Sequence, residues 1–288
     1  MPRILLNGTP IHYQQQGQGP DLVLIHGLFS NIAFWWTQAA PLLAGRFRVT
    51  ALDLRGHGFS GMPATGYRAS DLAGDILALM DHLEIDGAHL VGHSFGGAIA
   101  LAGAMDWPDR VDRITLADAW IPSLQAQAPL PQRTHWPVLQ RRLRARGIVI
   151  ETALPRVAMG FLEEIRDAPA ALGASGISGV PVAASGARPP RAVRRWTELM
   201  ARTQAWSEFH ADETLAPKRL ETIERPVKLV YGARSRYHES RDALARILPD
   251  RRMHEVAGGH FFPLFHPEAL AGVILEAPGR APAAQILV

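Results

Sequence analysis

The chain has 288 residues, of which 47% are hydrophobic and 20% are charged, and its formal net charge is +3. These values predict one large folded domain with room for an insertion, and they exclude a disordered chain. No apolar run reaches the ~18–20 residues that a transmembrane helix needs, and the first residues lack the pattern of a secretion signal. The chain has no cysteine, which excludes disulfides and cysteine catalysis, so we expect a cytoplasmic protein.

The first 117 residues alternate apolar runs with longer amphipathic stretches. Residues 69–83 carry apolar side chains at helical spacing, and a second helix is predicted to begin near Phe95. Strands that alternate with helices favour a mostly parallel, doubly wound sheet, an α/β fold. The strands predicted in this part are residues 22–25, 47–52, 88–92 and 114–117.

The alternation stops between residues 120 and 217, where prolines and helical stretches replace clear strands. It resumes afterwards, which predicts an α/β core made of residues 1–119 and 218–288 with a helical cap, residues 120–217, inserted between them. The elements predicted after the cap are a strand at 227–231, a helix at 240–248, a strand at 253–256 and a helix after Pro267.

Arginine supplies nearly all of the positive charge, and it is clustered at residues 141–146 and 188–195. The simplest interpretation of both clusters is a solvated helix face. They also leave open an anionic substrate or carrier, such as an acyl carrier or a CoA thioester. No nucleic-acid-binding motif accompanies them, so the expected partner is a small molecule.

Residues 92–96 have the pattern G-x-S-x-G at the point where a predicted strand meets a predicted helix. A serine on such a sharp turn needs small neighbours, because side chains two positions away would strike the backbone. The helix start also favours developing negative charge. This context predicts that Ser94 is a nucleophile.

A serine hydroxyl needs a base to take its proton. His260 follows the last predicted strand on a loop that begins with Gly258 and Gly259, a position from which an imidazole can reach the end of the sheet. Near the other end of the chain, Gly27 follows the strand at 22–25. The amides of Leu28 and Phe95 are therefore candidates for an oxyanion hole.

Together these motifs resemble the α/β-hydrolase superfamily, over about residues 7–117 and 227–275. Four segments carry the resemblance in order: His26-Gly27, the stretch 53–60, the elbow at 92–97 and Gly258-Gly259-His260. The resemblance implies the α/β-hydrolase fold and supports the oxyanion role of Leu28. It also implies that the stretch 53–60 is a structural turn, so that His57 is not the base.

The sequence departs from the family at the third member of the triad. Family members usually carry an aspartate three residues after the glycine that ends the next-to-last strand, and Ser235 stands there. Some relatives carry the acid directly after the strand that follows the nucleophile helix, which implies Asp118 here. A helix cap is the alternative role for Asp118, and Glu239 and Asp242 are reserve candidates for the acid.

The function that fits best is hydrolysis of a carboxylic ester or thioester through an acyl-serine, with no cofactor and no metal. A serine at the nucleophile position argues against dehalogenation, which needs a carboxylate there. The alternatives are acyl transfer or cyclisation, cleavage of a carbon–carbon bond, and ligand binding without turnover. Phe29, Trp120 and Trp206 are candidates for a pocket that takes an apolar or aromatic acyl group, although tryptophans are more often core residues.

Overall fold

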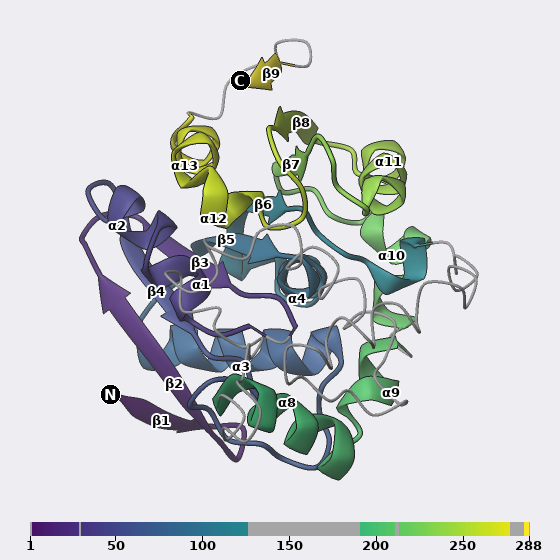
Figure 1. Cartoon of the computed structure of the whole chain (residues 1–288). Helices are drawn as coiled ribbons and strands as arrows, with labels where there is room; N and C mark the ends of the chain where they lie inside the picture. Colours follow the sequence, from purple (N-terminus) through teal and green to yellow (C-terminus); the bar gives the residue numbers. More distant parts are fainter. Residues whose placement is uncertain (1, 29, 126–190, 211–212, 277–284, 288) are drawn as a thin grey trace, which may run out of the picture.

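A nine-stranded sheet forms the centre of the molecule, with the order β1-β2-β4-β3-β5-β6-β7-β8-β9 (Figure 1). The computed structural model describes residues 2–28, 30–125, 191–210, 213–276 and 285–287. From β4 to β9 all neighbouring strands are parallel, and β1 and β2 are antiparallel to their neighbours. The strands are β1 (Arg3–Leu6), β2 (Thr9–Gln16), β3 (Asp21–Ile25), β4 (Arg48–Leu52), β5 (Ala88–His93), β6 (Val111–Ala117), β7 (Val227–Gly232), β8 (Arg251–Val256) and β9 (Gln285–Leu287).

The six strands predicted from apolar runs are all present as β3 to β8, and the fold class is α/β as predicted. Every residue of the central strand β5 is buried, as expected for a parallel strand that is covered on both faces. The sequence did not predict β1, β2 or β9. In β2 the polar run that ends at Gln16 hides the strand, because the side chains of this run are partly exposed to water.

Helices cover both faces of the sheet (Figure 1). Buried side chains of α3, α4 and α11 share one apolar cluster with β5, β6 and β7. Buried side chains of α1, α2, α12 and α13 form the cluster on the other face. The helices are α1 (Ala33–Trp36), α2 (Ala39–Leu43), α3 (Ala69–His82), α4 (Phe95–Asp106), α11 (His238–Ile247), α12 (Phe262–Phe265) and α13 (Pro267–Leu275).

In the segment predicted as a cap, all of the elements that the structure describes are short or medium-length helices. They are η2 (Pro122–Leu124), α8 (Arg191–Arg202), α9 (Ala205–His210) and η3 (Glu213–Leu215), and α10 (Pro217–Leu220) begins at the last residue of the segment. Leu199 of α8 and Phe209 of α9 are fully buried against the core. Residues 126–190, which include the arginine cluster at 141–146 and the start of the second cluster, lie outside the described residues.

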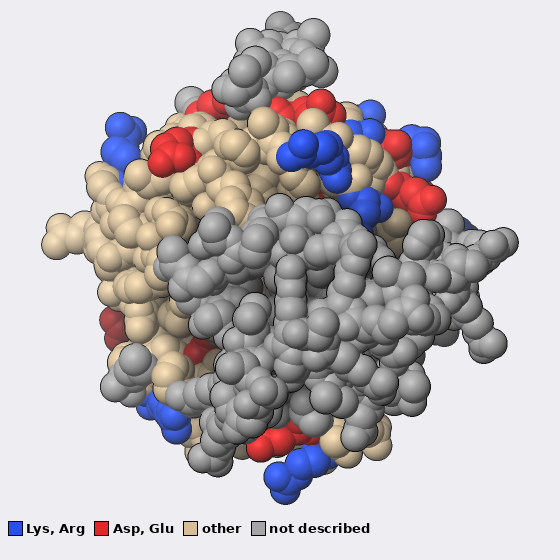
Figure 2. Space-filling model, viewed as in Figure 1, with Lys and Arg blue, Asp and Glu red and all other residues tan. Residues whose placement is uncertain are grey.

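The visible surface of the described residues mixes charges of both signs (Figure 2). On this face the acidic and basic side chains lie mainly near the margins, and none of the described ones gather into a large patch of a single sign. None of the helices that the structure describes combines the length and the apolar character required to cross a bilayer.

Candidate active site

Ser94 lies on a sharp turn between β5 and α4, with backbone angles of φ 54° and ψ −124°. A non-glycine residue in this region is strained, and such strain is typical of functional positions. Glycines make the turn possible. A Cβ on Gly92 would lie 2.2 Å from the carbonyl oxygen of Gly96, and one on Gly96 would lie 2.3 Å from that of Ile25. The side chain of Ser94 is therefore held at the carboxyl end of the sheet.

Gly27 packs directly against Ser94 from the neighbouring strand end. A Cβ at position 27 would lie 2.7 Å from Ser94 Cβ and 3.3 Å from its Oγ. Among the described residues, no acceptor takes a hydrogen bond from the amide of Leu28 or from that of Phe95, the first residue of α4. The predicted oxyanion residues thus border Ser94, and their backbone donors remain available to a bound anion.

His260 forms a hydrogen bond with Asp118: the Nδ1 and Oδ2 atoms are 2.8 Å apart, and both side chains are buried. An ionised carboxylate only accepts hydrogen bonds, so Nδ1 carries the proton and Nε2 is the acceptor of a neutral ring. Among the described residues no hydrogen bond joins Ser94 to His260. That contact is often long in enzymes without substrate.

Asp118 follows β6 directly, where its φ of 50° turns the chain into the left-handed region. Its amide donates to the carbonyl of Val230 on β7, so the carboxylate sits between two adjacent strand ends. Oδ1 accepts the Gly232 amide at 2.9 Å, and Oδ2 accepts the Ser235 hydroxyl at 2.7 Å. Asp118 precedes no helix directly, and its side chain is not a helix cap.

The two reserve acids make other contacts. Glu239 accepts a hydrogen bond from the Gln125 side chain at 3.2 Å, and Asp242 accepts one from Arg241 at 2.8 Å. Both lie on α11 rather than at a strand end. Of the three carboxylates considered, the structure gives only Asp118 a hydrogen bond with His260.

Aromatic side chains surround the imidazole of His260. The Tyr237 ring meets it edge-on, with centroids 4.6 Å apart, and the His93 ring lies at the same distance in a tilted stack. Burial, with the nearby His260, holds the pKa of His93 well below its ordinary value. The neutral His93 donates from Nε2 to the His260 carbonyl at 2.9 Å, and so it fixes the loop that carries His260.

His57 belongs to the structural turn at 53–60. Burial lowers the pKa of this side chain to about 3, and its Nδ1 bonds with the carbonyl of Arg55. In the same turn, Asp53 accepts hydrogen bonds from the amides of Ile32 and Phe59 and from the His12 ring. The turn therefore ties together the loops after β3 and β4, and the printed hydrogen bond of the His57 ring goes to the backbone of this turn rather than to Ser94.

The predicted pocket residues lie at different depths. Trp120 is buried, packs against the Phe95 ring at 5.8 Å, and donates its amide to the Ser94 carbonyl at 3.1 Å. Trp206 on α9 is half-buried. Phe29 lies outside the described residues. Of the three, Trp120 directly adjoins the nucleophile elbow.

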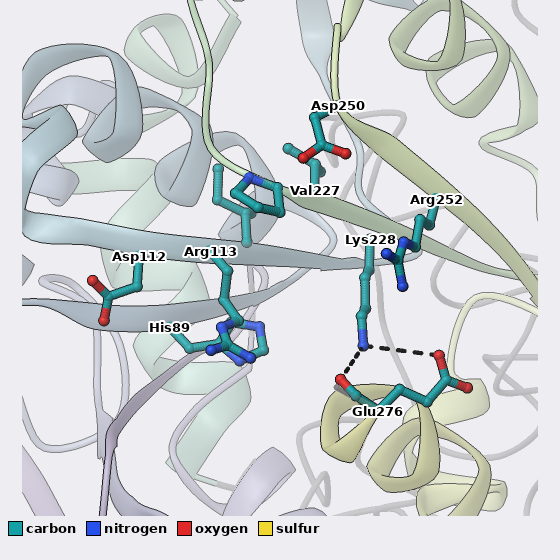
Figure 3. Close-up of a pocket in the computed structure, with 10 residues that line it drawn as sticks. His89, Asp112, Arg113, Val227, Lys228, Asp250, Arg252 and Glu276 are labelled. Atoms are coloured by element: carbon teal, nitrogen blue, oxygen red, sulfur yellow. Dashed lines mark hydrogen bonds and ion pairs between the residues drawn. The ribbon is translucent and has the colours of Figure 1, made fainter. Parts of the chain in front are cut away.

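A separate cavity of about 350 Å³ opens at the amino ends of β6 and β7, away from Ser94 (Figure 3). The Lys228 ammonium points to the end of α13, where it donates to the carbonyls of Val273 and Glu276. Lysine near a helix carboxyl end offsets unpaired carbonyls, so this lysine has a structural role. Acidic and basic residues line the cavity together, and no three of the described His, Asp and Glu side chains group as metal ligands.

The sheet order, the elbow after β5 and the strand-end cluster of Ser94, Asp118 and His260 define a hydrolase of the α/β type. The chain belongs to the family described as alpha/beta hydrolase fold, whose model matches residues 20–267.

The chain is also similar to individual hydrolases. It is 39% identical over 120 residues to a soluble epoxide hydrolase of Corynebacterium sp. (strain C12), covering 42% of this chain and 41% of that protein. It is 36% identical over 129 residues to a 2-(acetamidomethylene)succinate hydrolase of Mesorhizobium japonicum, covering 44% of this chain and 45% of that protein. These matches span less than half of each relative.

A solved structure with the same fold is the enol-lactonase from Burkholderia xenovorans LB400. The TM-score is 0.68 at 22% identity, and the match covers 95% of this chain and 98% of the lactonase. At this identity the likeness concerns the fold alone.

Proposed function

We propose that this protein is a serine hydrolase that cleaves a carboxylic ester or thioester through an acyl-serine intermediate. Ser94 attacks the acyl carbon while His260 takes the hydroxyl proton. His260 then returns a proton to the leaving group, and Asp118 orients the ring and stabilises its charged form. Water releases the acyl group in the second half of the reaction by the same proton transfers.

The observation that carries this proposal is the hydrogen bond between His260 Nδ1 and Asp118 Oδ2 at 2.8 Å. It holds the ring with Nδ1 protonated, which leaves Nε2 as the proton acceptor that a serine nucleophile requires. The burial of both partners strengthens the bond, because little water competes for it. Ligand binding without turnover would not need this arrangement.

The amides of Leu28 and Phe95 are the proposed oxyanion hole. Both N–H groups lack an acceptor among the described residues, and Phe95 stands at the amino end of α4. Preorganised donors of this kind stabilise the negative charge that develops on the substrate oxygen, typically by a factor of 10²–10³ for each donor.

We further propose that residues 120–217 form a helical cap over a core of residues 1–119 and 218–288. Trp120, Trp206 and Phe29 would then line an apolar or aromatic acyl pocket. The burial of Trp120 beside the Ser94 carbonyl supports its part in this pocket. The names of the relatives cover several kinds of hydrolysed bond, so acyl preference is a matter for direct assay.

A fluorophosphonate probe and a panel of acyl esters and thioesters of varied chain length test the function. The intact protein should be labelled at Ser94 and should hydrolyse at least one class of substrate. Ser94→Ala should lose both labelling and turnover while keeping its fold, because the serine is small and its removal leaves almost no cavity. Ser240→Ala, which removes another buried hydroxyl, is the control and should keep both. Turnover by Ser94→Ala would contradict the proposal.

A further inference from the structure

We propose that Ser235 is a positioning residue that holds the Asp118 carboxylate in place for His260. The inference rests on the proposed function and deepens it, because Ser235 occupies the position where the family usually carries its acid. The hydroxyl of Ser235 is 2.7 Å from Asp118 Oδ2, the same oxygen that faces His260 Nδ1 at 2.8 Å. One carboxylate oxygen thus joins the two side chains.

The direction of the Ser235 hydrogen bond follows from its other partner. The amide of Tyr237 donates to Ser235 Oγ at 3.0 Å, so that oxygen already accepts one hydrogen bond. The remaining proton of the hydroxyl points to a carboxylate that can only accept. Ser235 therefore donates to Asp118, and its orientation is fixed from two sides.

The turn that carries Ser235 donates hydrogen bonds to both oxygens of the Asp118 carboxylate. The Ser235 amide bonds to the Gly232 carbonyl at 2.9 Å, and the Gly232 amide donates to Asp118 Oδ1 at 2.9 Å. Each carboxylate oxygen therefore has a donor from this turn, which fixes the carboxylate plane and directs Oδ2 at His260. Tyr237, two residues further on, also packs edge-on against the His260 ring.

Burial increases the cost of losing the hydrogen bond between Ser235 and Asp118. Ser235 is 8% exposed and Asp118 is 0% exposed, so water would not readily replace a lost hydroxyl. A hydrogen bond to a charged group contributes more to stability than one between neutral groups. In a buried site, water does not replace the hydrogen bond when it is lost. We expect Ser235→Ala to lower kcat by on the order of tenfold, with KM little changed, because only the orientation of the base is affected.

The test compares Ser235→Ala with Ser240→Ala in the full-length protein. Ser240 is also buried and bonds to Gln125, but it has no hydrogen bond with Asp118 or His260 among the described residues. We expect only Ser235→Ala to lower kcat, and Ser235→Thr, which restores a hydroxyl, to recover most of it. Circular dichroism and thermal unfolding check that each variant is folded.

A proton NMR measurement separates this inference from the proposed function. The Nδ1 proton between His260 and Asp118 should give a low-field resonance, which Ser235→Ala should shift and Ser240→Ala should leave in place. This readout needs no substrate, so it stands even if Ser94 is not labelled by a fluorophosphonate. An unchanged resonance together with unchanged kcat in Ser235→Ala would overturn the positioning role. Equal effects in Ser235→Ala and Ser240→Ala would overturn it as well, because they would indicate general destabilisation.

Discussion

Asp118 Oδ2 lies 2.8 Å from His260 Nδ1, although 142 residues separate the two in the chain. Asp118 directly follows β6, and His260 lies on the loop after β8, with β7 between these two strands in the sheet. The carboxyl ends of these parallel strands lie side by side, so a carboxylate after β6 reaches an imidazole that follows β8. The contact makes an acid after β7 unnecessary.

The contribution of Asp118 can be measured by substitution. Asp118→Asn should lower kcat by up to about 10⁴-fold, because an amide favours the wrong tautomer of His260 and does not stabilise the charged ring. Glu239→Gln and Asp242→Asn should cost little, since Glu239 bonds with the Gln125 side chain and Asp242 with Arg241. If one of these two is crippling and Asp118→Asn is nearly silent, the acid has been assigned wrongly.

Exchange of the acid and the hydroxyl tests whether a carboxylate at position 235 can replace Asp118 as the partner of His260. Asp118→Ser alone should lose most activity, and the double variant Asp118→Ser/Ser235→Asp should regain at least tenfold. The reason is that Ser235 Oγ and His260 Nδ1 both lie within 2.8 Å of the same atom, Asp118 Oδ2. The control is Asp118→Ser/Ser235→Asn, which has the same size without the charge and should stay inactive. Equal activity in the two double variants would show that the charge at 235 does not reach the ring.

Gly27 offers a test of the proposed oxyanion hole. Gly27→Ala places a Cβ 2.7 Å from Ser94 Cβ, which should push the Leu28 amide away from the reacting centre. We expect kcat to fall by on the order of 10²-fold with a small change in KM. Gly45→Ala is the matched control, because a Cβ there meets nothing within 4 Å. Full kcat in Gly27→Ala would contradict this role of the loop.

Trp120 and Trp206 should govern the choice of substrate more than the chemistry. Trp120→Leu and Trp206→Ala are expected to alter the ratio of kcat/KM values across acyl chain lengths by several fold, while the rate of fluorophosphonate labelling at Ser94 changes less. The comparison uses the same ester panel for each variant. A uniform loss on all substrates, with labelling lost in parallel, would indicate a purely structural role.

Buried histidines should make the protein sensitive to mild acid. Burial lowers the pKa of His57 to about 3 and holds the pKa values of His89 and His93 well below 6.5. The unfolded chain binds protons at these sites near pH 6.5, whereas the folded chain does not. The contribution of these histidines to the free energy of unfolding is therefore complete above about pH 6.5. It is lost as the pH falls, by up to ~1.4 kcal/mol per pH unit for each histidine.

Urea unfolding between pH 7 and 4.5 measures this loss. His57→Asn should make the fall in the free energy of unfolding with decreasing pH less steep, by about the contribution of one histidine, up to ~1.4 kcal/mol per pH unit. His238→Asn is the control at a half-buried histidine. If the slope is the same in both variants and the parent, the buried histidines do not account for the acid sensitivity.

Much of the fold could be predicted from the sequence, because its signals are local. The apolar runs that became β3, β5 and the end of β6 are short and almost wholly buried, as in strands covered on both faces. The edge strand β1 and its neighbour β2 were missed, since a partly exposed strand carries a mixed pattern such as that ending at Gln16. The partial exposure of an edge weakens the apolar signal on which such predictions depend.

The sequence alone determined the sharp turn at Ser94, because Gly92 and Gly96 satisfy a steric demand that acts within five residues. It also narrowed the acid to Asp118, Glu239 and Asp242. The tertiary structure decided which carboxylate meets His260 and which neighbours hold it. The hydrogen bonds of Asp118 to Gly232, Ser235 and His260 join strand ends more than 100 residues apart in sequence. Their geometry depends on the parallel packing of β6, β7 and β8, which no local pattern encodes.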